Sequence, residues 1–73
     1  MSYARLRGRI KEYFGTEKEF SEAMKKNPAT ISAKLNNNST WKREDIEKAC
    51  TLLEIPIEKV HLYFFEEKLG NLN

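Results

Sequence analysis

The sequence predicts an all-α fold, a compact bundle of five short helices in a single domain. Apolar residues recur every three to four positions, and no segment alternates with a period of two for long enough to form a sheet. Two helix-start signals, at Thr16 and Asn27, lie eleven residues apart. Only about three residues then separate the two helices. Helices joined by so short a connection must cross steeply, which is the geometry of a helix-turn-helix.

The first helix is expected over residues 3–14. Its apolar stripe repeats at helical spacing and consists of Tyr3, Leu6, Ile10 and the pair Tyr13 and Phe14. Ser2 is a possible N-cap. Gly15 follows the stripe and ends the helix, because glycine readily adopts the backbone conformation of a helix C-terminus.

The helix-turn-helix is expected to consist of helices over residues 17–25 and 28–36. Thr16 and Glu19 have the spacing of a capping box, in which the two residues satisfy each other's backbone N–H groups. Asn27 is a good N-cap, and Pro28 suits the first helical position because its missing N–H is not needed there. Ile31 and Leu35, four residues apart, are expected to face the core.

Residues 36–40 contain no apolar side chain and predict an exposed loop. A fourth helix is expected over residues 42–53, with a core-facing stripe of Ile46, Ala49, Cys50 and Leu53. Pro56 interrupts the pattern and predicts the start of a fifth helix over residues 57–66.

The charges divide the 73-residue chain into two unlike parts. Residues 1–43 hold ten Lys and Arg against four acids, whereas residues 44–73 hold three lysines against seven acids. Two solvated surfaces can differ in sign by chance. Because the basic half coincides with the helix-turn-helix, the favoured interpretation is a basic face that meets a polyanion.

Several other functions are not expected from this composition. No apolar stretch approaches the length of a membrane span or a signal peptide, so a cytoplasmic protein, associated with the nucleoid of a bacterial host, is expected. Cys50 and His61, the only cysteine and histidine, cannot make a zinc site or an internal disulfide. No nucleophile or phosphate-loop motif is present, so neither an enzyme nor a cofactor is predicted.

In a helix-turn-helix, the outward face of the second helix meets base edges in the major groove. The residues expected to face bases are Pro28, Ala29, Ser32 and Ala33. The residues expected to face phosphates are Asn27, Thr30, Lys34, Asn36, Asn38, Ser39, Lys42 and Arg43. Trp41 is interpreted as a packing residue, with a contact from its indole N–H to a sugar as the alternative.

The segment Thr16-Glu17-x-x-Phe20-Ser21-x-x-Met24, followed by Asn27-Pro28-Ala29-Thr30-Ile31-Ser32, resembles the helix-turn-helix of lambdoid phage repressors, the Cro/CI-like or Xre-type family. The whole sequence is also similar to small Cro-like phage proteins of Gram-positive bacteria. The resemblance implies a five-helix lambda-repressor-like DNA-binding domain. It also implies a homodimer that binds a palindromic operator in double-stranded DNA to repress transcription.

The chain departs from the family pattern at several positions. Glu17 stands where the family commonly has a glutamine that binds a phosphate, and Lys25 stands where a turn glycine is common. Lys26 replaces an aliphatic core residue, unless its stem covers the core while its ammonium reaches water. These departures favour an alternative: a protein-interaction module, such as an antirepressor or assembly partner, that keeps the fold without binding DNA. Its interface could include the apolar residues 61–65.

Overall fold

The computed structural model describes residues 3–65 and folds them into helices with short connections. The helices are α1 (Ala4–Phe14), α2 (Glu17–Met24), α3 (Pro28–Leu35), α4 (Arg43–Leu53) and α5 (Val60–Phe64), the last preceded by a 3₁₀ turn, η1 (Ile57–Lys59). No strand occurs in this part of the chain. The predicted all-α fold of five helices is therefore confirmed.

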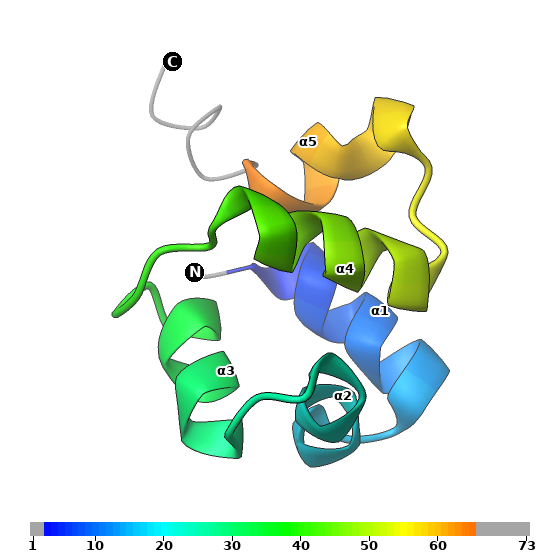
Figure 1. Cartoon of the computed structure of the whole chain (residues 1–73). Coiled ribbons are helices and arrows are strands. Elements are labelled where there is room, and N and C mark those ends of the chain that lie inside the picture. The colour runs from blue at the N-terminus through cyan, green and yellow to red at the C-terminus, as the bar shows by residue number, and fades with distance from the viewer. Residues whose placement is uncertain (1–2, 66–73) are drawn as a thin grey trace.

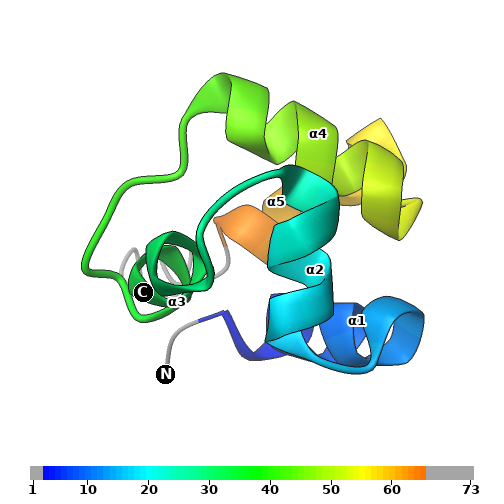
Figure 2. The same ribbon diagram turned by 60° about the horizontal axis from the view of Figure 1, so that its bottom comes forward.

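Helix α1 passes behind α4 in Figure 1 and contacts α2, α4 and α5. Helices α2 and α3 lie below this pair, and α5 lies above it (Figure 1). Helix α3 is seen from the side in Figure 1 and nearly end-on in Figure 2, whereas α2 is nearly end-on in Figure 1. The two helices therefore cross steeply, as the short connection predicts.

The core is built from the apolar stripes of all five helices and from the segments between them. Leu6 and Ile10 of α1, with Ile31 and Leu35 of α3, are almost completely buried, as predicted. The remaining buried apolar residues are Phe20, Met24, Trp41, Ala49, Leu53, Ile55 and Phe64. In a domain this small, so few core side chains leave a modest stability margin.

The limits of α1 to α4 each differ from the expected ones by one residue at one end, a normal uncertainty at helix ends. Helix α2 ends at Met24 because Lys25 adopts a left-handed conformation with a φ of 61°. The expected fifth helix starts as the 3₁₀ turn, and its α-helical part ends at Phe64. The expected limit at residue 66 and the possible cap Ser2 lie outside the described residues.

Candidate recognition surface

Caps at three helix ends hold α2 and α3: both ends of α2 and the start of α3. The Thr16 hydroxyl accepts the Glu19 backbone N–H at 3.1 Å, and the Asn27 side-chain oxygen accepts the Ala29 N–H at 2.8 Å. At the end of α2, the Lys25 N–H donates to the Glu22 carbonyl. Local hydrogen bonds therefore fix where α3 begins and at what angle it leaves α2.

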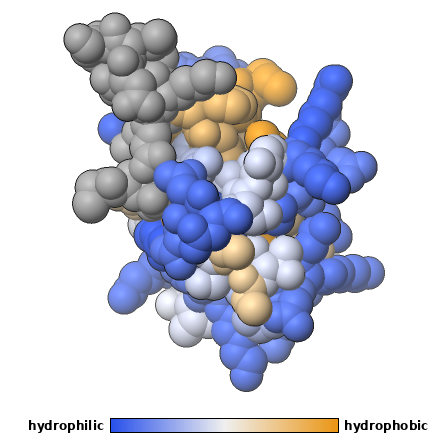
Figure 3. Space-filling view, turned by 90° about the vertical axis from the view of Figure 1, so that its left-hand side faces the viewer, coloured by the Kyte–Doolittle hydropathy of each residue, from blue (hydrophilic) through white to orange (hydrophobic). Residues whose placement is uncertain are grey.

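Helix α3 turns one side to the core and the other to solvent. Ile31 and Leu35 are 0% exposed. Of the residues expected to face bases, Pro28 and Ala29 are exposed, whereas Ser32 and Ala33 are half-buried. We call these four residues the α3 face. In Figure 3 the lower half of the molecule, over α3, shows pale, small side chains ringed by blue hydrophilic ones.

Lys34 does not belong to this exposed surface. Its side chain is only 6% exposed, and its ammonium lies 3.2 Å from Asp45 Oδ2 and donates to the Thr40 carbonyl at 2.8 Å. This burial corrects the expectation that Lys34 faces a phosphate. The cause is a carboxylate eleven positions further along the chain, because a buried ammonium needs a paired charge and hydrogen bonds.

Asp45 is the centre of this buried cluster. It also accepts the backbone N–H of Lys42 at 3.2 Å and lies 3.4 Å from the Lys26 ammonium. Burial raises the pKa of Asp45, but the hydrogen bonds from Lys34 and from the Lys42 backbone outweigh it, so that the pKa lies below its usual value. Asp45 therefore stays ionised and links the ends of α2 and α3 to the start of α4.

Sequence reasoning missed Arg7, which connects α1 to both helices of the helix-turn-helix. Its guanidinium donates to Glu17 at 2.8 Å, to the Leu35 carbonyl at 2.9 Å and to the Asn36 side-chain oxygen at 2.6 Å. The Glu17 carboxylate therefore has a cation beside it within the chain. No local pattern identifies such a contact, because its partners lie 10, 28 and 29 residues away.

Most of the residues expected to face phosphates do lie on the surface. The exposed ones are Asn27, Thr30, Asn36, Asn38, Ser39, Lys42 and Arg43. Asn36 is also in contact with the α3 face, because its side-chain N–H group lies 3.4 Å from the Ser32 hydroxyl. Arg43 forms an ion pair with Glu47 at 3.1 Å on the exposed side of α4.

Trp41 packs in the core, as interpreted. It is 8% exposed, and its ring meets Phe64 edge-on with the centroids 5.1 Å apart. Tyr3 meets it in a similar way at 6.1 Å, and the Lys34 ammonium lies 5.9 Å from the ring centroid. Trp41 therefore packs the loop after α3 against α5.

Comparison with known proteins identifies the family of the chain. The model of a family described as a protein of unknown function (DUF739) matches residues 1–67. The chain belongs to the DUF739 family. Among solved structures, the DUF739 chain is similar to the solution structure of the modulator of repression (MOR) of the temperate bacteriophage TP901-1 from Lactococcus lactis. The two are 41% identical, with a TM-score of 0.80, over 88% of this chain and 86% of that one. No curated protein sequence matches the chain.

The similar phage protein is by name a regulator and not an enzyme. The DUF739 chain is thus related to a small all-helical phage regulatory protein. This agrees with the expectation from the sequence that its relatives are small phage regulators. Among residues 3–65, no group of three His, Cys, Asp or Glu side chains is placed to hold a metal ion. None of the described helices has the length and apolar character needed to span a membrane.

Proposed function

We propose that this chain regulates phage gene expression by modulating repression, and that it does so by binding a protein of the repression system. The observation that carries the regulatory role is the similarity to the TP901-1 modulator of repression, at 41% identity over 88% of the chain. Identity at this level over nearly the whole domain supports a shared role as well as a shared fold. We propose the α3 face as the contact surface.

The chemistry of the α3 face favours a protein partner over DNA. Pro28, Ala29, Ser32 and Ala33 carry no charge and no amide group, so they are poorly suited to reading guanine or adenine edges. Lys34, the one cation in α3, is neutralised in the interior by Asp45. Small, uncharged side chains lose little on desolvation, which suits a protein interface.

The basic residues of the N-terminal half are also partly used within the fold. Arg7 and Arg9 donate to the carbonyls of Leu35 and Leu53, at the C-terminal ends of α3 and α4. At least five of the ten cations in residues 1–43 have partners within the chain: Arg7, Arg9, Lys26, Lys34 and Arg43. The positive charge available to phosphates is thus smaller than the sequence suggests.

Binding of operator DNA in the manner of Cro is the second candidate. The observation that favours it is the capped, exposed N-terminus of α3, which presents backbone N–H groups where a phosphate could bind. In this proposal a homodimer binds a palindromic site. Pro28, Ala29, Ser32 and Ala33 then face bases, and phosphates meet the exposed set Asn27, Thr30, Asn36, Asn38, Ser39, Lys42 and Arg43.

One experiment separates the two candidates. The purified chain is titrated with the repressor of the phage that encodes it and, separately, with that phage's operator DNA at low and moderate salt. We expect binding to the repressor, and only weak, salt-sensitive retention on DNA. Ala29→Glu should weaken repressor binding about tenfold, because a buried, unpaired charge in an interface is costly. Ala4→Glu, at the exposed start of α1, is the matched control.

The opposite pattern would favour the second candidate. Tight binding to a two-fold symmetric operator without repressor binding contradicts the protein-partner proposal. In that case Arg43→Ala should weaken binding to all DNA sequences alike, since a phosphate contact carries no sequence information. Failure to bind either molecule would contradict both candidates.

A further inference from the structure

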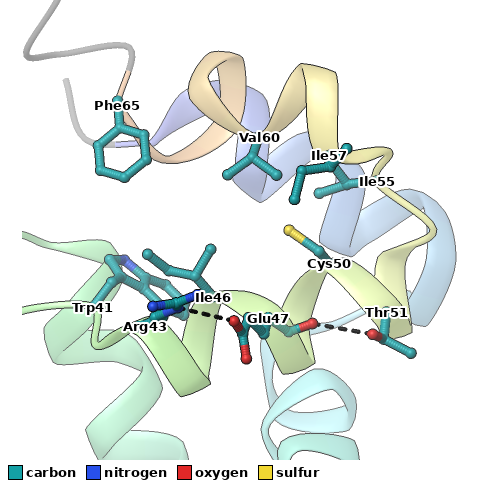
Figure 4. Close-up of a pocket in the computed structure, with 10 residues that line it drawn as sticks. All are labelled: Trp41, Arg43, Ile46, Glu47, Cys50, Thr51, Ile55, Ile57, Val60 and Phe65. Carbon is teal, nitrogen blue, oxygen red and sulfur yellow. Dashed lines mark hydrogen bonds and ion pairs between the residues drawn. The ribbon is translucent and has the colours of Figure 1, made fainter.

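An apolar groove lies between α4 and the segment formed by η1 and α5 (Figure 4). Its volume is about 630 Å³, within the range of sites that bind small organic molecules or peptide side chains. Ile46 and Cys50 line it from α4, and Ile57 and Val60 line it from the opposite side. Trp41 and Phe65 lie together at one end of it in Figure 4.

The side chains at the mouth of this groove are unusually exposed for their type. Ile57 is 87% exposed and Phe65 is 42% exposed. They are two of the three large hydrophobic residues that residues 3–65 leave exposed. A cluster of apolar surface beside a groove is typical of an interaction site, because covering it with apolar groups is favourable.

The charged groups of the groove argue against an anionic ligand. Arg43 and Glu47 are the charged side chains that line it, and they pair with each other at 3.1 Å. A phosphate or a carboxylate would find a cation whose charge is already balanced by a neighbouring acid. The groove therefore does not suit nucleic acid, which needs an excess of positive charge.

The Trp41 indole nitrogen supplies the polar element of the site. Trp41 Nε1 is buried and has no hydrogen-bond partner within residues 3–65. Figure 4 shows this nitrogen on the side of the ring toward Phe65, across the end of the groove. A buried N–H without an acceptor costs free energy, so an acceptor brought by an occupant of the groove would be favourable.

We infer that this groove binds an apolar peptide segment of a partner protein, with a backbone carbonyl of that segment accepting the Trp41 indole N–H. Such a segment would place aliphatic side chains against Ile57 and Val60 and would supply the acceptor that the Trp41 indole N–H lacks. This goes beyond the proposed function, since α3 and α5 lie on different sides of the molecule (Figure 1). It defines a second interaction surface, and its test requires neither a repressor nor DNA.

The test uses the single tryptophan of the chain, whose indole N–H gives one signal in an ¹H–¹⁵N correlation spectrum. The full-length protein is titrated with the capped peptide acetyl-Leu-Ser-Leu-amide. The control peptide, acetyl-Ala-Ser-Ala-amide, has the same backbone carbonyls without the large side chains. We expect the leucine peptide to move the indole proton downfield and the alanine peptide to have little effect.

Substitutions place the binding site. Ile57→Ser should weaken binding of the leucine peptide about tenfold, because most of the Ile57 side chain is available to be covered. Ile57 is too exposed for this change to unfold the domain. Ala33→Ser on the α3 face is the control and should leave binding unchanged. Equal shifts with both peptides, or unchanged binding by Ile57→Ser, would overturn the inference.

The C-terminal residues of the chain are the other conceivable occupant. In the peptide-free protein, a double substitution of Leu69→Ser and Leu72→Ser should leave the indole signal in place. If that variant alone moves the signal and strengthens binding of the leucine peptide, the chain's own end fills the groove, and a partner segment is ruled out.

Discussion

Lys25 shows how one residue can oppose the turn that contains it. The residue caps α2 in a left-handed conformation with a φ of 61°, where a Cβ atom is unfavourable and glycine is preferred. The turn forms nevertheless, because the backbone N–H of Lys25 donates to the Glu22 carbonyl and that of Lys26 donates to the Ser21 carbonyl. The turn is thus formed at a cost in stability.

Replacing Lys25 with glycine should therefore stabilise the domain. We expect the free energy of unfolding to rise by roughly 0.5–1 kcal/mol, the relief of the left-handed strain less the extra freedom of glycine in the unfolded chain. Urea unfolding followed by Trp41 fluorescence measures the change. Lys25→Ala is the control, since alanine removes the same charge and keeps the strain. An equal gain in both variants would show that charge and not conformation is responsible.

Three helices are closed at their C-terminal ends by cations from other elements. Arg7 donates to the last carbonyl of α3, Arg9 to that of α4, and Lys48 to that of α2 at 3.1 Å. Terminal carbonyls have no partners within their own helix, and they are the negative end of its dipole. These contacts explain how helices of eight to eleven residues hold their ends in place.

The N-terminus of α3 depends instead on a local cap. Asn27→Ala should lower the free energy of unfolding by about 1 kcal/mol, because the Ala29 N–H loses its acceptor. Amide hydrogen exchange should become faster at Ala29 and Thr30 before it changes elsewhere. Asn27→Ser keeps a capping oxygen and should retain most of the stability. An alanine variant as stable as the parent would mean that water replaces the cap without cost.

On the scale of the whole molecule, the pairing of Lys34 and Asp45 holds α3, the following loop and α4 together. Both side chains are at least 94% buried, and the Lys34 ammonium also bonds the Thr40 carbonyl within that loop. Such a pair adds little more to the free energy of unfolding than two well-packed apolar residues would. The loss of one partner, however, leaves a buried charge without compensation.

Asp45→Asn should therefore destabilise the domain by about 3 kcal/mol, a large share of the stability of a chain this small. Adding Lys34→Met should restore much of the loss, because the ammonium that lacked a partner is then gone. Thermal unfolding followed by circular dichroism compares the single and double variants. If the double variant is as unstable as Asp45→Asn alone, the lost contacts to Lys42 and Lys26 would account for the effect.

The sequence by itself determined the elements of this protein. Hydrophobic periodicity, capping residues and helix-breaking residues all act within a few positions of the chain. From them the sequence predicts five helices, helix ends at Thr16, Asn27 and Gly15, and the side of α3 that faces the core. They also placed Pro28 and Ala29 on the surface. These features depend on local backbone and side-chain chemistry, which a single sequence displays.

Only the tertiary structure decided what the charged residues do. Lys34 is buried because its ammonium pairs with the Asp45 carboxylate at 3.2 Å. Arg7 caps the C-terminal end of α3 because the fold brings its guanidinium to the carbonyl of Leu35, 28 residues away in the chain. The apolar groove and the buried indole N–H likewise arise where α4 meets α5. Each depends on a partner brought close by packing, and spacing along a single chain does not record such proximity.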